Sequence, residues 1–70
     1  MIIRTADELT QTVRERRREL GLTQEQLADI IGVHRAFVSK LERGRGAPRF
    51  DLLLRLVQAL GMDVELRPRG

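Results

Sequence analysis

The sequence of 70 residues contains no cysteine, tryptophan or tyrosine, and its only aromatic side chains are Phe37 and Phe50. Without cysteine, the chain can form neither a disulfide nor a zinc site with thiolate ligands. Two aromatic side chains are too few to stack the successive bases of a single-stranded nucleic acid. No apolar run approaches the roughly 18 residues of a membrane-spanning helix. We therefore expect a cytoplasmic protein that does not associate with membranes.

Groups that carry catalysis are also scarce. His34 is the only histidine, and no carboxylate pair or nucleophile with a neighbouring base stands out from the sequence. Acid–base and nucleophilic catalysis both need such groups within hydrogen-bond reach, and a metal site needs several ligands. We therefore expect no enzymatic activity, no metal site and no cofactor.

The positive charge is concentrated in one segment. The chain as a whole has a formal net charge of only +3, but residues 33–49 contain five basic side chains and a single acidic one, Glu42. This concentration is typical of a surface that faces phosphates, although many charged runs are simply solvated.

Residues 23–44 predict two short helices joined by a tight turn. Thr23 and Gln26 have the spacing of a capping box at the start of the first helix. Gly32 stands where the chain must turn through a left-handed conformation, and Gly44 ends the second helix. This is the pattern of a helix-turn-helix, whose second helix lies in the major groove of DNA.

Two further helices and a strand are predicted around this motif. Helical periodicity extends over residues 6–20 and over residues 50–60, where the helix is apolar on more than one face. Such a helix needs contacts on two sides, and in so small a domain we expect a partner chain to supply the second. At the C-terminus, charged residues alternate with Met62, Val64 and Leu66, which is a strand pattern.

The predicted strand, residues 62–67, has no convincing partner within the chain, because residues 2–4 are only a weak candidate. An isolated strand leaves its backbone groups unpaired, so we expect it to pair with the same strand of a second subunit. The predicted organisation is a DNA-binding domain over residues 1–61, a dimerisation strand over residues 62–67 and a flexible tail over residues 68–70.

The sequence resembles the XRE-type, lambdoid-repressor-like helix-turn-helix family. The resemblance covers about residues 9–60 and is strongest in residues 22–28, 32–33 and 38–44, while residues 60–66 are most similar to the HipB-like antitoxins. It implies an all-α, four-helix domain of the lambda-repressor type with a short C-terminal β-strand that pairs across a dimer.

The resemblance also implies a function. The protein would be a homodimeric transcriptional repressor that binds a pseudo-palindromic operator in double-stranded DNA. It would also act as the antitoxin and autorepressor of a HipA-like kinase toxin. Two alternatives remain open: a stand-alone XRE-type regulator without a toxin, and a protein-interaction module that does not depend on DNA.

Site residues follow from the same resemblance. The residues expected to face bases share one side of the second motif helix, at positions i, i+1, i+4 and i+5; they are Arg35, Ala36, Ser39 and Lys40. The residues expected to contact phosphates are Gln24, His34, Arg43, Arg45 and Arg49.

The arginines of the first helix are expected to differ in role. Arg17 falls on the apolar stripe, and the resemblance implies that it forms a partly buried ion pair with Glu42. We expect Arg14, Arg16 and Arg18 to be mostly solvated and balanced by neighbouring glutamates.

Two positions depart from the family pattern. The family usually has serine or threonine as the cap of the second motif helix and of the last helix, whereas this chain has His34 and Arg49.

Overall fold

Four helices make up the fold. The computed structural model describes residues 2–70, and its helices are α1 (Ala6–Glu19), α2 (Gln24–Ile31), α3 (Arg35–Glu42) and α4 (Phe50–Ala59). The predicted all-α, four-helix architecture is thus confirmed. Met1, the first residue of the predicted DNA-binding domain, lies outside the described residues.

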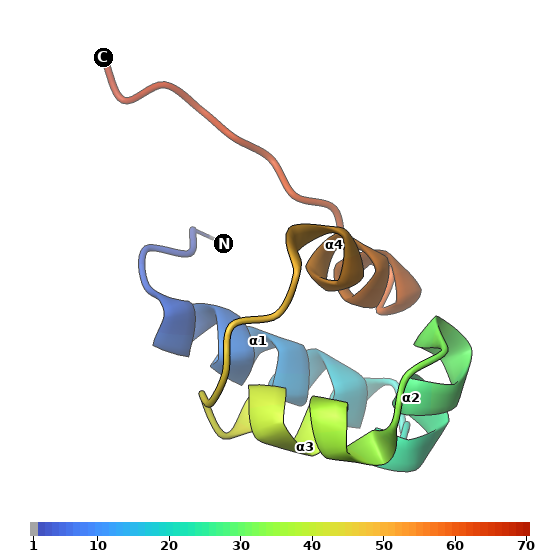
Figure 1. Ribbon diagram of the computed structural model, residues 1–70. Coiled ribbons are helices and arrows are strands. Elements are labelled where there is room, and N and C mark those ends of the chain that lie inside the picture. The colour runs from blue at the N-terminus through green and yellow to red at the C-terminus, as the bar shows by residue number, and fades with distance from the viewer. Residues whose placement is uncertain (1) are drawn as a thin grey trace.

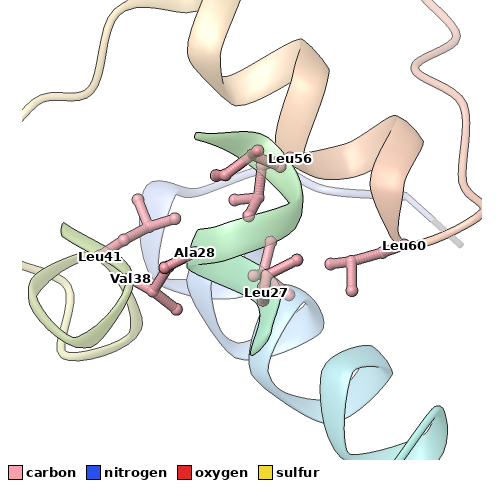
Figure 2. Packing of buried hydrophobic residues seen from close by; sticks show 8 residues of the cluster. Leu27, Ala28, Val38, Leu41, Leu56 and Leu60 are labelled. Atoms are coloured by element: carbon pink, nitrogen blue, oxygen red, sulfur yellow. The ribbon is translucent and has the colours of Figure 1, made fainter. Parts of the chain in front are cut away.

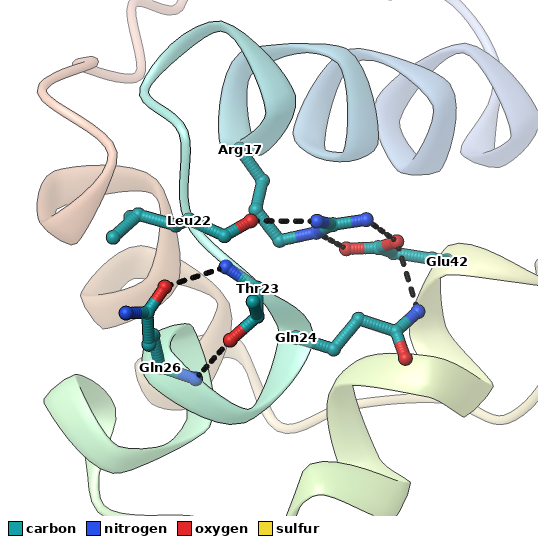
Figure 3. A network of polar contacts seen from close by, with 6 residues as sticks. All are labelled: Arg17, Leu22, Thr23, Gln24, Gln26 and Glu42. Atoms are coloured by element: carbon teal, nitrogen blue, oxygen red, sulfur yellow. Dashed lines mark hydrogen bonds and ion pairs between the residues drawn. The ribbon is translucent and has the colours of Figure 1, made fainter.

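The helix starts are fixed by side-chain caps where the sequence provides them. At α1, the hydroxyl of Thr5 accepts from the backbone N–H of Glu8 at 3.1 Å, while the Glu8 carboxylate accepts from the N–H of Arg4 at 2.7 Å. At α2, the capping box is complete: Thr23 accepts from the N–H of Gln26, and Gln26 accepts from the N–H of Thr23 (Figure 3). These bonds satisfy backbone donors that a helix start leaves free.

The helix ends lie within one residue of the prediction. α1 ends at Glu19 with Leu20 as its C-cap, and α4 ends at Ala59 with Leu60 as its C-cap. Between α2 and α3, Gly32 has φ of 76°, the left-handed conformation that glycine adopts without steric cost. The chain can therefore turn into α3 within three residues.

The helices place α3 and α4 on opposite sides of the molecule (Figure 1). α2 contacts both of them, and α1 also contacts α3. Residues 43–49 carry the chain from the end of α3 to the start of α4, and the C-terminal residues leave the body on the side of α4. One face of α3 is therefore left uncovered by the rest of the chain.

The hydrophobic core joins all four helices, and Figure 2 labels its members from α2, α3 and α4. Ala28 is 1% exposed, and its small side chain lets α2 and α3 approach closely. Eight buried residues form the core: Val13, Leu27, Ala28, Ile31, Val38, Leu41, Leu56 and Leu60. A core of this size makes stability sensitive to every further contact.

Two arginine side chains donate hydrogen bonds to carbonyls at the C-terminal ends of helices other than their own. Arg16 Nε donates to the carbonyl of Leu60 at 2.9 Å, and Arg55 Nη1 donates to the carbonyl of Ile31 at 3.1 Å. Both acceptors belong to the last turn of a helix, where carbonyls lack an intrahelical partner and cations are favoured. Arg16 pairs with Glu19 at 3.2 Å, as expected, but it is half-buried rather than mostly solvated, because it also connects α1 to the end of α4.

The predicted C-terminal strand is not formed: residues 62–67 have no regular secondary structure. A strand needs a hydrogen-bonded neighbour, and residues 2–4 are not a strand either. Apolar side chains of α4 and of the C-terminal residues remain exposed, with Phe50 66%, Val64 48% and Leu66 87% accessible. From residue 2 to residue 70, none of the helices has both the length and the apolar character needed to cross a membrane.

Candidate nucleic-acid interface

A buried ion pair ties α3 to α1. Arg17 Nε and Nη2 donate to the two carboxylate oxygens of Glu42 at 2.7 and 2.9 Å, and Arg17 Nη1 donates to the carbonyl of Leu22 at 2.7 Å. Figure 3 shows the guanidinium lying between these two acceptors. The side chains of Arg17 and Glu42 are only 10% and 2% exposed. The structure thus brings together the two residues that the sequence analysis paired.

The ion pair keeps both groups charged in spite of burial. Burial by itself raises the pKa of Glu42, but the hydrogen bonds from Arg17 and Gln24 and the positive charges of Arg17 and Arg14 outweigh it, so the pKa of Glu42 is lowered. The hydrogen bond to Glu42 raises the pKa of Arg17 against the opposing effect of burial. Removing one partner of a buried ion pair is strongly destabilising, because the other charge is left buried without compensation.

Gln24 extends this network to the start of α2. Its Nε2 donates to Glu42 Oε1 at 3.2 Å, so the first residue of α2 is bonded to the last residue of α3. Figure 3 shows the Gln24 side chain reaching across to the carboxylate. The contact fixes the position of α3 relative to the two helices before it.

The uncovered face of α3 carries the residues expected to contact bases. Arg35, Ala36 and Lys40 are exposed, while Ser39 is half-buried. On the opposite face of the same helix, Val38 is fully buried. The helix is therefore held by its apolar side and presents two cations to solvent.

The start of α3 lacks a side-chain cap. His34 is the N-cap residue and forms no capping bond, as the departure from the family pattern led us to expect. Its carbonyl accepts from the N–H of Phe37 at 2.9 Å, which begins the helix. Val33 is half-buried and holds the turn on the core, while His34 is exposed.

The residues expected to contact phosphates fall into two places. Arg43 is the C-cap of α3, and Arg45 follows it with its N–H bonded to the carbonyl of Lys40 at 3.0 Å, so both lie at the end of α3. Arg49 instead lies at the start of α4, where its Nη2 pairs with Asp51 at 3.0 Å. The structure therefore groups Arg43 and Arg45 with α3, but not Arg49.

Arg55 was not among the residues predicted to have a role. Its bond to the carbonyl of Ile31 holds the last residue of α2, immediately before the turn into α3. The two residues are 24 positions apart, so no local pattern announces the contact. Arg55 lies on the polar face of α4, which by itself is typical of a solvated side chain.

The chain is similar in sequence to known helix-turn-helix proteins. The family model described as Helix-turn-helix matches residues 13–66. An uncharacterized HTH-type transcriptional regulator from Methanothermobacter thermautotrophicus is 49% identical over 51 residues, which is 73% of this chain and 74% of that protein.

Two solved structures share the fold. The clp gene regulator ClgR from C. glutamicum superposes with a TM-score of 0.78 at 34% identity, covering 87% of this chain and 80% of that one. A chain in the structure of the HipA–HipB–O2–O3 complex gives a TM-score of 0.88 at 23% identity, covering 100% of this chain and 99% of that one. The matched family model and the 49% identical relative place the protein in the helix-turn-helix family of DNA-binding transcriptional regulators, of the XRE type.

Proposed function

We propose that the protein is a sequence-specific repressor that reads double-stranded DNA with α3. The observation that carries this proposal is the uncovered face of α3, where Arg35 and Lys40 are exposed while the apolar face is anchored in the core. Both cations can donate to O6 and N7 of guanine in the major groove. Ala36 can contact a thymine methyl group, and Ser39 can reach a base or a phosphate.

Phosphate contacts on either side of α3 would set its orientation in the groove. Gln24 lies at the start of α2, where helix N-termini favour phosphate. Arg43 and Arg45 lie at the C-terminal end of α3, whose last residue Glu42 accepts from Gln24, and both are exposed. His34 and Arg49 were expected to join them; His34 is adjacent to Arg35, whereas Arg49 would reach DNA only if the backbone passed the start of α4. Such contacts supply affinity without sequence preference.

The repressor would act as a homodimer. The side of the molecule opposite α3 exposes Phe50, Val64 and Leu66, which is a large apolar surface for a chain of this length. Residues 62–67 lack a ladder partner in the single chain, and the same segment of a second copy would supply one, antiparallel about a two-fold axis. Because this side faces away from α3, two subunits could contact successive half-sites of a pseudo-palindromic operator.

We further propose an antitoxin role. The chain in the HipA–HipB–O2–O3 complex matches this one over its whole length, including the residues after α4. The corresponding partner of this protein would be a HipA-like kinase toxin. The relatives described only as HTH-type transcriptional regulators favour the second candidate, a regulator without a toxin. A protein-interaction module independent of DNA is the third, and the exposed basic face of α3 argues against it.

Selection from a pool of random duplexes tests the proposal. The protein should enrich one sequence with two-fold symmetry, and footprinting should show two half-sites whose centres lie about 10 base pairs apart, or a multiple of that spacing. Recovery of unenriched sequence would contradict sequence-specific binding. Affinity capture from the native host tests the antitoxin role, which predicts that a kinase-like chain is the bound partner.

A further inference from the structure

An open groove of about 470 Å³ lies between the first half of α1 and the end of α3. Asp7, Gln11 and Arg14 line it from α1, and Arg43 and Arg45 line it from the other side. The three α1 residues are spaced by four and three positions, so they share one face of the helix. Figure 1 shows the first half of α1 beside the end of α3, where the loop to α4 begins.

The charge of this groove is positive. Arg14, Arg43 and Arg45 line it against the carboxylates of Asp7 and Glu42. The Glu42 carboxylate is already held by two bonds from a buried arginine and one from a glutamine, so it does not neutralise the groove. Three guanidinium groups thus share the groove with one free carboxylate.

Arg14 is free to bind a ligand. It is exposed, and none of the ion pairs or hydrogen bonds described between residues 2 and 70 involves its guanidinium. It nevertheless lies close enough to Glu42 for its charge to contribute to the lowered pKa of that carboxyl. Arg14 therefore lies close to the end of α3, although it is a residue of α1.

The loop after α3 passes close to α1 at Gly44. A Cβ atom on Gly44 would lie 3.4 Å from Asp7 Oδ1, and the φ of Gly44 is 72°. This close approach brings the arginines on either side of Gly44 to the same surface as Arg14. The groove thus continues the basic end of α3 onto the first helix.

We propose that Arg14 binds a phosphate of the duplex read by α3, adjacent to the phosphates bound by Arg43 and Arg45. The DNA interface then extends from α3 across the groove onto α1. The inference deepens the proposed function and rests on it. Guanidinium groups suit phosphate oxygens geometrically, and a phosphate contact carries no sequence information. Arg14 therefore adds affinity on every sequence and contributes nothing to base preference.

The test uses Arg14→Gln and, as the matched control, Arg18→Gln. Both remove one exposed charge from the same helix, but Arg18 does not line the groove. Binding is measured with a mixed-sequence duplex of about 30 base pairs, from 50 to 200 mM salt. Each phosphate contact that is lost should reduce the slope of log K against log salt by about 0.9. The ratio of wild-type affinity to Arg14→Gln affinity should therefore fall about threefold per bound subunit as the salt rises from 50 to 200 mM.

Two more variants separate a phosphate contact from a structural role. Arg14→Lys keeps the charge and should restore most of the wild-type slope, because lysine also binds phosphate. Asp7→Asn removes the free carboxylate of the groove and should strengthen binding to the mixed-sequence duplex. A purely structural role for this face would not produce such a gain.

The outcomes distinguish this inference from the proposed function. The inference is wrong if the wild type binds the duplex and Arg14→Gln has the same slope of log K against log salt. It is also wrong if Arg18→Gln loses as much affinity as Arg14→Gln. In both cases sequence-specific reading by α3 stands. If random selection enriches no sequence but Arg14→Gln still reduces the slope, the proposed specificity is wrong and the groove contact stands. A wild type that binds no duplex overturns both.

Discussion

Glu42, the last residue of α3, accepts hydrogen bonds at both carboxylate oxygens from Arg17 of α1, at 2.7 and 2.9 Å. The pair is nearly excluded from solvent, and all three guanidinium nitrogens of Arg17 are engaged, since Nη1 donates to Leu22. With Gln24 also bonded to Glu42, the end of α3 is attached to α1 and α2 together. The Glu42 carboxylate therefore helps to hold the orientation of the uncovered face of α3, together with the buried Val38 and Leu41.

Removal of that carboxylate should be strongly destabilising. Glu42→Gln keeps the size of the side chain but leaves Arg17 buried without a counter-charge, and we expect the free energy of unfolding to fall by about 3 kcal/mol. Glu19→Gln is the matched control, because Glu19 pairs with Arg16 at 3.2 Å but is 65% exposed. An exposed pair contributes at most about 1 kcal/mol. Urea unfolding of the two variants checks this, and equal midpoints would mean that burial of the pair does not matter.

The free energy of unfolding of the wild type should depend on pH through the carboxylate of Glu42. The pKa of Glu42 is lower in the folded chain than its ordinary value of 4.5, so the stabilisation is fully present above pH 4.5. Below it, the unfolded chain binds the proton first, and the stabilisation is lost as the pH falls toward the lowered pKa. Glu42→Gln has no such proton to bind. The difference in unfolding free energy between wild type and Glu42→Gln should therefore narrow between pH 5 and pH 2.5, and a constant difference would contradict the lowered pKa.

Dimerisation should depend on the backbone of the C-terminal segment. Val64→Pro removes a backbone N–H that an intermolecular ladder would use, and we expect monomers, a lower melting temperature and weaker operator binding. Val64→Thr is the control, because it keeps the N–H and the β-branched shape. Sedimentation at micromolar concentration measures the outcome. A dimeric Val64→Pro, or a monomeric wild type, would show that residues 62–67 do not join two subunits.

The four helices could be predicted because their periodicity, and several of their ends, are encoded locally. Thr5, Thr23 and Gly32 have the side chains or the conformational freedom that each helix boundary requires, and the structure uses all three. The exposed face of α3 followed from the same periodicity that buries Val38. Local sequence was sufficient wherever a residue acts within its own helix.

Contacts between distant segments could not be predicted in this way. Arg16 and Arg55 have the spacing of solvated helix residues, yet each donates to a carbonyl at the end of another helix. The alternation of apolar and charged residues over 62–67 indicates a strand with one apolar face that would be buried. A strand forms only beside another strand, however. The bonds of these residues depend on which helix ends meet, and on whether a second chain is present.

In the proposed complex, α3 reads bases while the arginines at its end bind the DNA backbone. A comparison of Arg35→Ala with Arg45→Ala on two duplexes, the sequence enriched by selection and a mixed sequence, tests this division of roles. Arg35→Ala should cost roughly 1–3 kcal/mol on the enriched sequence, relax one base position and change mixed-sequence binding much less. Arg45→Ala should weaken both alike and flatten the salt dependence. If Arg35→Ala lowers the affinity for both duplexes equally, α3 does not read bases through Arg35, and the account is contradicted.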